Sequence, residues 1–361
     1  MPRSKLNIEK FLEETALFID RTVEKYIPRK FDESSLIFTL SPPRYKPDLE
    51  ALNKAVAEPI WEFLDRGGKR WRPTLFLLVC EALGCDPQRF IDFAIIPEVL
   101  HNGTLIADDI EDASESRRGR LCTYKLFGVD IAVNVSDALF FLPMLVLLNN
   151  RDKFSLEKTR KIYEVYIQEM INLSFGQAID IAWHKGLASA DYVSDKEYLQ
   201  MCVYKTGTLA RMAAKMASIL AGADESITEK MGRFAESIGI AFQIQDDILD
   251  LVGEEFARGK GGLGMDITEG KRSFIVIHTL QEATPEDKKR LTTILNMHTK
   301  DKRLKDKAIR IIRKYGSIEY AKNFALKIVQ DSWIEVDKIL HPSGAKEKLR
   351  ALTNYLIMRE I

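Results

Sequence analysis

Two acidic stretches, DDIED at residues 108–112 and DDILD at residues 246–250, dominate this chain. Each follows a strongly apolar segment, which predicts that each lies on a helix packed against a core. Residues four apart lie one turn above each other on a helix, so Asp108 and Asp112 share a face, as do Asp246 and Asp250. Like charges at that spacing repel each other, and burying them costs more. The pattern therefore predicts a bound cation, above all Mg²⁺, which prefers oxygen ligands.

The composition argues against several classes of protein. The 361 residues carry 53 Lys+Arg and 53 Asp+Glu, so no global field favours nucleic acid or an anionic membrane. The four cysteines show no CxxC spacing, which argues against a zinc site or a disulfide framework. Acids interrupt the N-terminal stretch too early for a signal peptide, and the longest apolar runs, such as residues 138–148, are too short to span a bilayer. We expect a soluble cytoplasmic protein that is not an integral membrane protein and binds no nucleic acid.

Helical patterns run through nearly the whole chain, which predicts an all-α fold. Helix starts are marked by capping boxes at residues 194–197 and 226–229, and by Thr284 before Pro285. No alternating runs with paired turn signals predict a sheet. The stretch SPPRYKP at residues 41–47 reads as a loop, so we expect an N-terminal helix and proline-containing linker over 1–47 and the main domain over 48–361.

Basic residues supply a partner for an anion. The stretch RGGKRWRP at residues 66–73 joins a glycine turn to several cations just before a helix start, which favours an anionic group. Lys205-Thr206-Gly207 interrupts a helical pattern, Lys260 lies in a glycine-rich loop at 259–264, and Lys271 follows it. Each of these cations alone is typical of a protein surface. Together with the carboxylates they favour a site in which bound metal and cations hold phosphate oxygens.

These motifs together resemble those of the trans-isoprenyl diphosphate synthases, the polyprenyl synthetase family. The matching segments, in the family's order, are GGKRWRP, HNGTLIADDIEDASESRRG, YKTG, FQIQDDILD and GKGGLGMDITEGK. The resemblance covers residues 55–285. It implies a single-domain antiparallel helical bundle with a deep central cavity, usually paired as a homodimer.

The resemblance also implies which residues bind metal and act in catalysis. The metal ligands would be Asp108, Asp109, Asp112, Asp246, Asp247 and Asp250. Of these, Asp108, Asp112 and Asp246 would bind directly, and Asp247 and Asp250 would support them. Three Mg²⁺ ions are expected per active site, and Mn²⁺ can substitute. The catalytic residues would be Asp108, Asp112, Lys205, Asp246 and Lys260.

Two further sets match positions that bind substrates in the family. The allylic diphosphate would be bound by Arg117, Lys205, Thr206, Gln243, Lys260 and Lys271. Isopentenyl diphosphate would be bound by Gly68, Lys69, Arg72, His101 and Arg118, without metal. His101 has a competing interpretation as a buried structural histidine.

The implied reaction is the head-to-tail (1'-4) condensation of isopentenyl diphosphate with dimethylallyl, geranyl or farnesyl diphosphate. Breaking the allylic C–O bond leaves negative charge on pyrophosphate, which metals and cations stabilise. The isopentenyl double bond then attacks the allylic cation, in an apolar cavity that excludes water. Both acidic stretches must act on the same pyrophosphate.

The residues just before the first acidic stretch favour geranylgeranyl diphosphate as the product. Gly103 and Thr104 are small where bulky aromatic residues are common in enzymes that stop at fifteen carbons, and Leu100 lies one turn further back. Phe140 or Phe141 of a neighbouring helix would then form the cavity floor. Farnesyl and longer products remain alternatives. So does a non-catalytic subunit of a heteromeric synthase, although such subunits usually lose one acidic motif; a terpene cyclase would not need Lys69 and Arg72.

Overall fold

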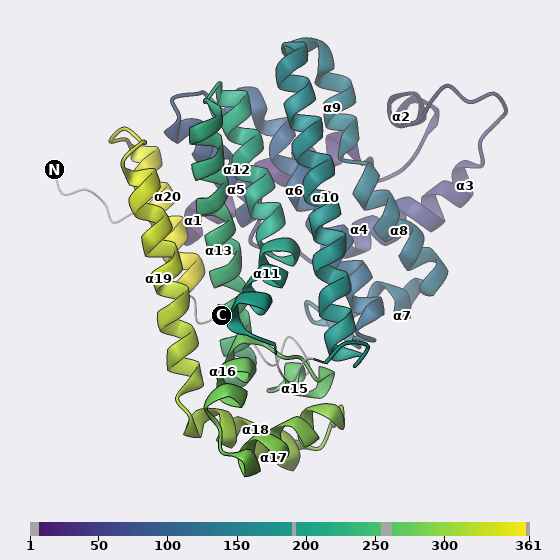
Figure 1. Cartoon of the computed structure of the whole chain (residues 1–361). Helices are drawn as coiled ribbons and strands as arrows, with labels where there is room; N and C mark the ends of the chain where they lie inside the picture. Colours follow the sequence, from purple (N-terminus) through teal and green to yellow (C-terminus); the bar gives the residue numbers. More distant parts are fainter. Residues whose placement is uncertain (1–6, 190–192, 254–261, 359–361) are drawn as a thin grey trace. The chain divides into compact units, whose positions relative to one another are not determined.

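The structure, a computed structural model, describes residues 7–189, 193–253 and 262–358 (Figure 1). Helices make up 78% of it, which confirms the all-α prediction. Within the described residues the strands are two residues long each, β1 (Ser116–Arg117) and β2 (Arg120–Leu121), paired antiparallel. Lys260, one of the predicted catalytic residues, lies outside the described residues.

The chain divides into two compact units, which we describe separately. Unit 1 comprises Met1–Tyr166, Met212–Glu229 and Leu340–Leu352. Unit 2 comprises Ile167–Arg211, Lys230–Ile339 and Thr353–Ile361. The boundary that the sequence predicts after residue 47 stays a prediction.

Unit 1 is built around a buried helix, α6. Its elements are α1 (Ile8–Tyr26), α2 (Glu33–Thr39), α3 (Leu49–Leu52), η1 (Asn53–Ala57), α4 (Glu58–Leu64), α5 (Trp71–Ala82), η2 (Pro87–Phe90), α6 (Ile91–Glu111), α7 (Thr123–Phe127), α8 (Val129–Phe141), α9 (Met144–Asn150) and η3 (Arg151–Lys153). Helix α6 contacts α1, α5, α8 and α9. Its residues Ile95, Ile96, Val99 and Leu100 are fully buried, so this helix forms the centre of the core.

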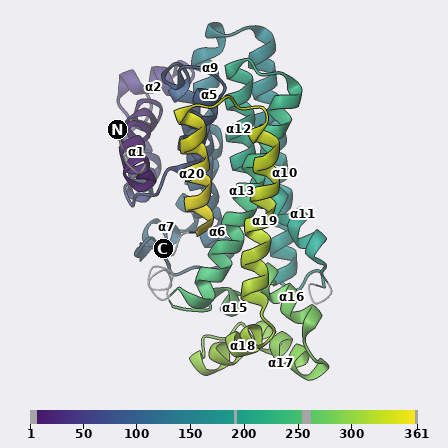
Figure 2. The same ribbon diagram turned by 90° about the vertical axis from the view of Figure 1, so that its left-hand side faces the viewer.

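The N-terminal helix α1 packs on this core rather than standing apart from it. Its buried residues recur with helical spacing, at Leu12, Ile19, Val23 and Tyr26. Both views also place α1 beside the first turns of α20 (Gly344–Met358), where the Lys348 ammonium lies 5.0 Å from the centroid of the Phe11 ring (Figures 1 and 2). Helix α1 thus lies against α5, α6 and α20.

Two helical segments of unit 1 correct the expectation that the longest apolar runs are too short to span a bilayer. Pro87–Glu111 and Val129–Lys153 are each long and apolar enough to cross a membrane, by length and composition alone. The sequence-based length was too short because the helical path continues from α8 through Pro143 into α9 and η3. Buried core helices of soluble proteins meet the same criteria, and 67% of the first segment is buried against 44% of the second.

Unit 2 has a separate core. It holds most of α10 (Leu156–His184), α11 (Asp195–Lys205), the first turn of α12 (Gly207–Ala221), most of α13 (Glu225–Val252), α15 (Met265–Glu269), α16 (Phe274–Glu282), α17 (Pro285–Asn296), α18 (Lys302–Lys314) and α19 (Ser317–Asp337). Ile244, Ile277, Leu291 and Ile312 are among the side chains that form its buried cluster.

Capping residues set several of these helix starts. Ser194 and Glu197 form the predicted capping box of α11, and Thr284 caps α17, where Pro285 is the first helical residue. The expected box at 226–229 is wrong in position. Helix α13 begins at Glu225, and the Asp224 carboxylate accepts the Ile227 N–H at 2.8 Å. An aspartate two residues upstream is an equally good cap, so the helix starts earlier.

Candidate active site

The first acidic stretch lies at the C-terminal end of α6, as the sequence predicts. Asp108 is partly buried, Asp109 is 1% exposed, and Asp112 is the residue that caps the helix. The carbonyl end of a helix is its negative pole, so carboxylates there are unfavourable unless cations accompany them. This position therefore favours a ligand or side chain of positive charge beside Asp108 and Asp112.

Arg117 supplies part of that charge. Its Nε and Nη2 donate to Asp109 Oδ1 at 2.8 and 2.6 Å, and its Nη2 lies 3.8 Å from Asp108 Oδ2. Burial raises the pKa of Asp109 even though Arg117 opposes that effect. Burial alone would lower the pKa of Arg117, but Asp109 and Asp108 raise it. The ion pair fixes Arg117 next to the first acidic stretch, where a diphosphate is expected.

A tight hairpin places Arg117 and Arg118. Arg118 and Gly119 both have positive φ, 53° and 75°, between β1 and β2, which is the pattern of a two-residue primed turn. The Arg66 guanidinium closes the hairpin by donating to the carbonyls of Arg117 and Leu121 at 3.2 and 2.8 Å. The sequence motif RRG is therefore a structural turn as well as a source of charge.

The glycine turn at 67–68 lies against two guanidinium groups. Gly68 has a φ of 149°, and a Cβ added there would lie 3.1 Å from Arg70 Nη1 and 3.2 Å from Arg118 Nη2. A side chain at this position would push those groups away. Arg70 itself has a left-handed backbone, with φ 47°, which costs a residue other than glycine about 1–2 kcal/mol.

Around Glu98 the structure gathers more positive than negative charge. Glu98 is 3% exposed and pairs with Arg70 Nη1 at 2.9 Å, and Asn102 links Glu98 to Arg118 through bonds of 3.3 and 3.4 Å. Arg72 is also buried, and its Nε has no hydrogen-bond partner among the described residues. Burial lowers the pKa of Arg72 and of Arg118 to about 10, so both remain cationic at neutral pH. This excess of guanidinium groups suits an anionic ligand.

His101 lies among the same cations, one turn beyond Pro97 on α6. Burial lowers its pKa well below 6.5, and Arg72, Arg118, Arg117 and Arg70 lower it further. The imidazole is therefore neutral at physiological pH. A neutral ring can still donate one hydrogen bond to a diphosphate oxygen without adding to the repulsion between the arginines.

The residues predicted to set product length lie close to α8. Leu100 is fully buried, and the Thr104 hydroxyl donates to the His101 carbonyl at 2.8 Å. A Cβ added at Gly103 would lie 3.0 Å from Phe140 Cε1, so Phe140 fills the space beside this glycine. Of the two candidate floor residues, Phe140 packs at Gly103, whereas Phe141 is 73% exposed.

The second acidic stretch lies within α13 and is more strongly engaged by the protein. Asp247 accepts from the Tyr198 hydroxyl at 3.0 Å and from Gln243 Nε2 at 2.8 Å. Asp250 accepts the backbone N–H groups of residues 265 and 266, at 3.1 and 3.2 Å, where α15 begins. Both aspartates are buried, while Asp246 is partly exposed. These bonds hold both carboxylates within the fold, and their predicted supporting roles at a metal stay predictions.

The predicted cations of unit 2 lie near carboxylates. Lys205 Nζ is 2.5 Å from Asp180 Oδ2, and Lys271 Nζ is 2.6 Å from Glu269 Oε2. Helix α11 ends at Lys205, and the Thr206 hydroxyl donates to Gln243 Oε1 at 3.3 Å. Because Gln243 in turn donates to Asp247, the end of α11 is linked to the second acidic stretch.

The close approach of the helices around Lys205 depends on Gly176. A Cβ added at Gly176 would lie 2.3 Å from the backbone nitrogen of Lys205, so only glycine allows α10 to approach α11 this closely.

The predicted residues that the structure describes thus fall into two groups. Those in unit 1 are Gly68, Lys69, Arg72, Leu100, His101, Gly103, Thr104, Asp108, Asp109, Asp112, Arg117 and Arg118. Those in unit 2 are Lys205, Thr206, Gln243, Asp246, Asp247, Asp250 and Lys271. Sequence reasoning missed their partners Glu98, Asn102, Tyr198 and Asp180. Glu98 is an acid inside the apolar run 93–100, and this sequence signal could have predicted a buried cation beside it.

The carboxylates fit a hard cation only in part. Among the described residues, no group of three or more His, Cys, Asp or Glu side chains lies close enough to hold a metal ion. Mg²⁺ is commonly bound by one or two carboxylates, with substrate phosphates and water completing the octahedron. Asp108 and Asp112, or Asp246, would suffice for that kind of site.

Comparison with known proteins gives the family. The family model described as Polyprenyl synthetase matches residues 53–312. The chain is 34% identical over 294 residues to a short chain isoprenyl diphosphate synthase of Methanothermobacter thermautotrophicus, covering 81% of this chain and 87% of that protein. It is 32% identical over 308 residues to a geranylgeranyl diphosphate synthase of Saccharolobus solfataricus, covering 85% of this chain and 91% of that protein.

A solved structure agrees with these matches. The crystal structure of a geranylgeranyl pyrophosphate synthetase from Pyrococcus horikoshii Ot3 has a TM-score of 0.83 and 31% identity, and the match covers 98% of each chain. The family model spans more than half of the sequence, and the relatives are similar over most of their length. This chain therefore belongs to the polyprenyl synthetase family.

Proposed function

We propose that this protein is a prenyltransferase that condenses isopentenyl diphosphate head to tail with allylic diphosphates and yields geranylgeranyl diphosphate. The observation that carries the proposal is the excess of buried guanidinium groups around Glu98, on the same helix, α6, that ends in the first acidic stretch. The diphosphate group of the substrate would balance that charge. The relatives named geranylgeranyl diphosphate synthase support the twenty-carbon product.

The isopentenyl diphosphate would be held by unit 1. Arg72 and Arg118 would pair with its phosphate oxygens, Lys69 would add a third positive charge, and neutral His101 would donate a hydrogen bond. Arginine forks match phosphate oxygens in pairs, which orients the substrate as well as binding it.

The allylic diphosphate would be held by Arg117, Lys205, Thr206, Gln243, Lys260 and Lys271. Lys205 and Lys271 lie beside Asp180 and Glu269, and the diphosphate would replace these carboxylates as their counter-ion. As the C–O bond breaks, the same cations stabilise the charge that builds on pyrophosphate. The released pyrophosphate then accepts the proton that the isopentenyl unit loses.

Asp108, Asp112 and Asp246 would hold the metal, with Asp109, Asp247 and Asp250 in support. When bound, Mg²⁺ would neutralise diphosphate oxygens and stabilise the departing pyrophosphate, with three ions expected and Mn²⁺ able to substitute. The donors are carboxylates alone, which select a hard cation over zinc or copper. In the complex, both acidic stretches act on one allylic diphosphate.

Product analysis tests this proposal. The purified protein is incubated with radiolabelled isopentenyl diphosphate and dimethylallyl, geranyl or farnesyl diphosphate, with Mg²⁺ or with a chelator. We expect Mg²⁺-dependent incorporation into a twenty-carbon diphosphate with each primer. A product of fifteen carbons or one longer than twenty contradicts the assignment of length, and no incorporation by the protein alone favours the non-catalytic subunit.

A cytoplasmic homodimer would account for the apolar surface. In unit 1, Val129, Val133 and Phe141 of α8 are 52%, 45% and 73% exposed, and in unit 2, α10 exposes Ile167, Ile171 and Phe175. Exposed apolar residues gathered along one helix, as on each of these two, favour an interaction site. Sedimentation of the purified protein tests the dimer. A monomer at micromolar concentration contradicts it, and recovery in the membrane fraction contradicts the cytoplasmic location.

A further inference from the structure

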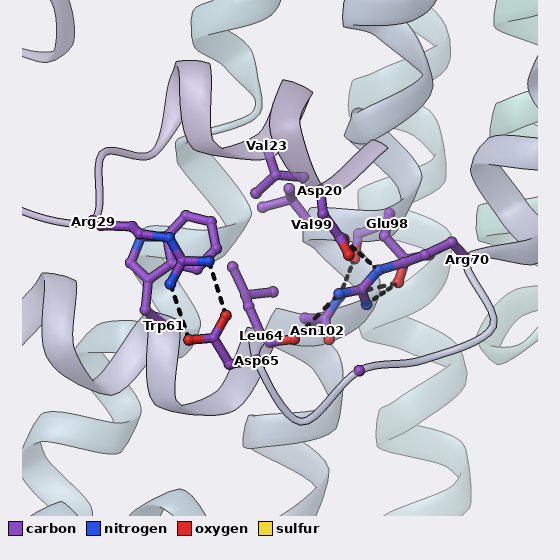
Figure 3. A pocket seen from close by; sticks show the side chains of 11 residues that line it. Asp20, Val23, Arg29, Trp61, Leu64, Asp65, Arg70, Glu98, Val99 and Asn102 are labelled. Atoms are coloured by element: carbon purple, nitrogen blue, oxygen red, sulfur yellow. Dashed lines mark hydrogen bonds and ion pairs between the residues drawn. The ribbon is translucent and has the colours of Figure 1, made fainter. Parts of the chain in front are cut away.

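A small cavity adjoins the glycine turn of unit 1, and its walls come from α1, α4, α6 and the loop that carries residues 67–70 (Figure 3). Its volume is about 130 Å³. Asp20 of α1 and Glu98 of α6 face Arg70 there, while Arg29, Trp61 and Asp65 form a separate group on the opposite wall. The sequence motif GGKR contains Arg70, but the roles implied by the family resemblance use only its glycine and lysine.

Arg70 is held by three groups at once. Its Nε donates to Asp20 Oδ1 at 2.9 Å, its Nη1 donates to Glu98 Oε1 at 2.9 Å, and its Nη2 donates to the Leu64 carbonyl at 3.2 Å. Its side chain is 4% exposed. Burial alone would lower the pKa of Arg70, but Glu98 and Asp20 raise it above its usual value. Arg70 is therefore a fixed charge inside the protein.

The backbone of Arg70 is fixed with it. Its left-handed conformation persists in a non-glycine residue only where the surroundings enforce it, and such residues gather at functional sites. The Arg70 carbonyl accepts the Thr74 N–H at 3.2 Å and the Thr74 hydroxyl at 2.9 Å. These bonds start helix α5, whose first turn carries Arg72.

We propose that Asp20 and Arg70 are positioning residues, which orient Lys69 and Arg72 for the diphosphate of isopentenyl diphosphate. The ion pair from α1 fixes the turn between Lys69 and Arg72, and so sets the direction of both side chains. The inference rests on the proposed function, because it assigns these cations to that substrate. It gives the N-terminal helix a role in binding one of the two substrates.

The rest of α1 stays docked without this pair. Tyr26 and Lys25 both contact the Asp92 carboxylate on α6, at 2.8 and 2.7 Å, and Asn150 donates to the Tyr26 hydroxyl at 3.1 Å. Leu12, Ile19 and Val23 remain buried. Loss of the Asp20 charge is therefore expected to loosen the turn at Arg70 without detaching the helix.

Asp65 provides a matched control in the same cavity. It accepts two bonds of 3.0 Å from Arg29, which also lies over the Trp61 ring at 3.9 Å (Figure 3). The side chains of Asp20 and Asp65 are 47% and 48% exposed, and each pairs with one arginine in the cavity wall. Only the Asp20 pair reaches the GGKR turn.

The test compares Asp20→Asn with Asp65→Asn in the full chain. For Asp20→Asn we expect KM for isopentenyl diphosphate to rise about threefold to tenfold, as for a partly exposed charge-assisted bond. KM for the allylic diphosphate should stay unchanged, and Asp20→Glu should restore most of the loss. Asp65→Asn should leave both KM values unchanged. A purely structural pair would lower the melting temperature of both variants and shift neither KM value selectively.

Arg70→Lys adds a second measurement. It keeps the charge but loses the fork that joins Asp20 to Glu98, so KM for isopentenyl diphosphate should rise by at least the same factor. Equal KM shifts in Asp20→Asn and Asp65→Asn, or shifts in both substrates, overturn the proposal.

Calorimetric titration with isopentenyl diphosphate separates this proposal from the proposed function. If the wild type binds that substrate without turning it over, the proposed reaction is wrong, and Kd values of the same variants still decide the role of Asp20. If the wild type does not bind it at all, both proposals fail.

Discussion

The two acidic stretches share the pattern DDxxD but differ in what surrounds them. In unit 1 the aspartates end a helix, Arg117 pairs with Asp109 and lies near Asp108, and Asp108 and Asp112 are partly accessible. In unit 2 the stretch lies inside a helix, and protein donors engage the carboxylates of Asp247 and Asp250. Three aspartates in the same spacing can thus be available mainly to a ligand in one stretch and be bonded mainly to the protein in the other. The hydrogen-bond partners of each carboxylate, rather than the DDxxD pattern, indicate whether it is available to a ligand or held within the fold.

The sharpest test of this difference uses Asp108→Asn and Asp246→Asn. Each removes a predicted direct metal ligand, so we expect kcat to fall about 10²–10³-fold in each, as for loss of one group that stabilises transition-state charge. Because both would act on one departing pyrophosphate, the double variant should lose less than the product of the two factors. Steady-state rates measure this. Fully multiplicative losses would mean that the two stretches act independently.

Asp250→Asn tests the other side of the comparison. The amide can accept only through one oxygen, and its NH₂ would face a backbone N–H, so we expect a loss of about 1–3 kcal/mol in the free energy of unfolding. Asp108→Asn, at a partly exposed position, should change that free energy by less than about 0.5 kcal/mol. Urea unfolding of both variants measures the difference. Equal stability losses would contradict the assignment of Asp250 to the fold.

A smaller effect is expected beside the first stretch, at Gly103. In Gly103→Ala the new methyl group would meet the Phe140 ring at 3.0 Å, and we expect a loss of about 1 kcal/mol in the free energy of unfolding from overpacking. Phe140→Leu should restore part of that stability in the double variant, because it vacates the space at the ring while the Leu139 Cβ stays 3.0 Å from the new methyl group. The double variant should also make longer products if Phe140 is the cavity floor. Unchanged product length would remove Phe140 from that role.

Local signals in the sequence predicted several of the helices that carry the candidate site. Helical periodicity predicted α6 and its acidic end, because apolar residues recur at a regular spacing along a helix that packs on a core. Capping residues located α11 and α17, since a cap acts only within its own turn. The motif residues were found because their charges are conspicuous next to apolar segments.

Contacts between residues distant in the sequence were not predictable in the same way. The pairing of Asp20 with Arg70 joins residues fifty apart, and no periodicity specifies it. The choice between Phe140 and Phe141 depends on the rotation of α8 about its axis, which packing against α6 decides. The start of α9 directly after Pro143 was also missed, because proline permits a helix start as readily as it marks an end.

The smallest expected effect concerns His101, whose ring should not titrate near neutral pH. Burial and four arginines disfavour its protonated form, so its pKa lies well below 6.5. As the pH falls below the pKa that His101 has in the unfolded chain, the unfolded chain binds a proton there that the folded chain does not. His101 therefore lowers the free energy of unfolding as the pH falls through that pKa.

NMR of ¹⁵N-labelled imidazoles measures this, with His101→Gln used to assign the resonance. No change between about pH 6 and 8 is expected for His101. A titration within that range would mean that an anionic group balances the arginines without any substrate, and the case for a diphosphate at Glu98 would weaken accordingly.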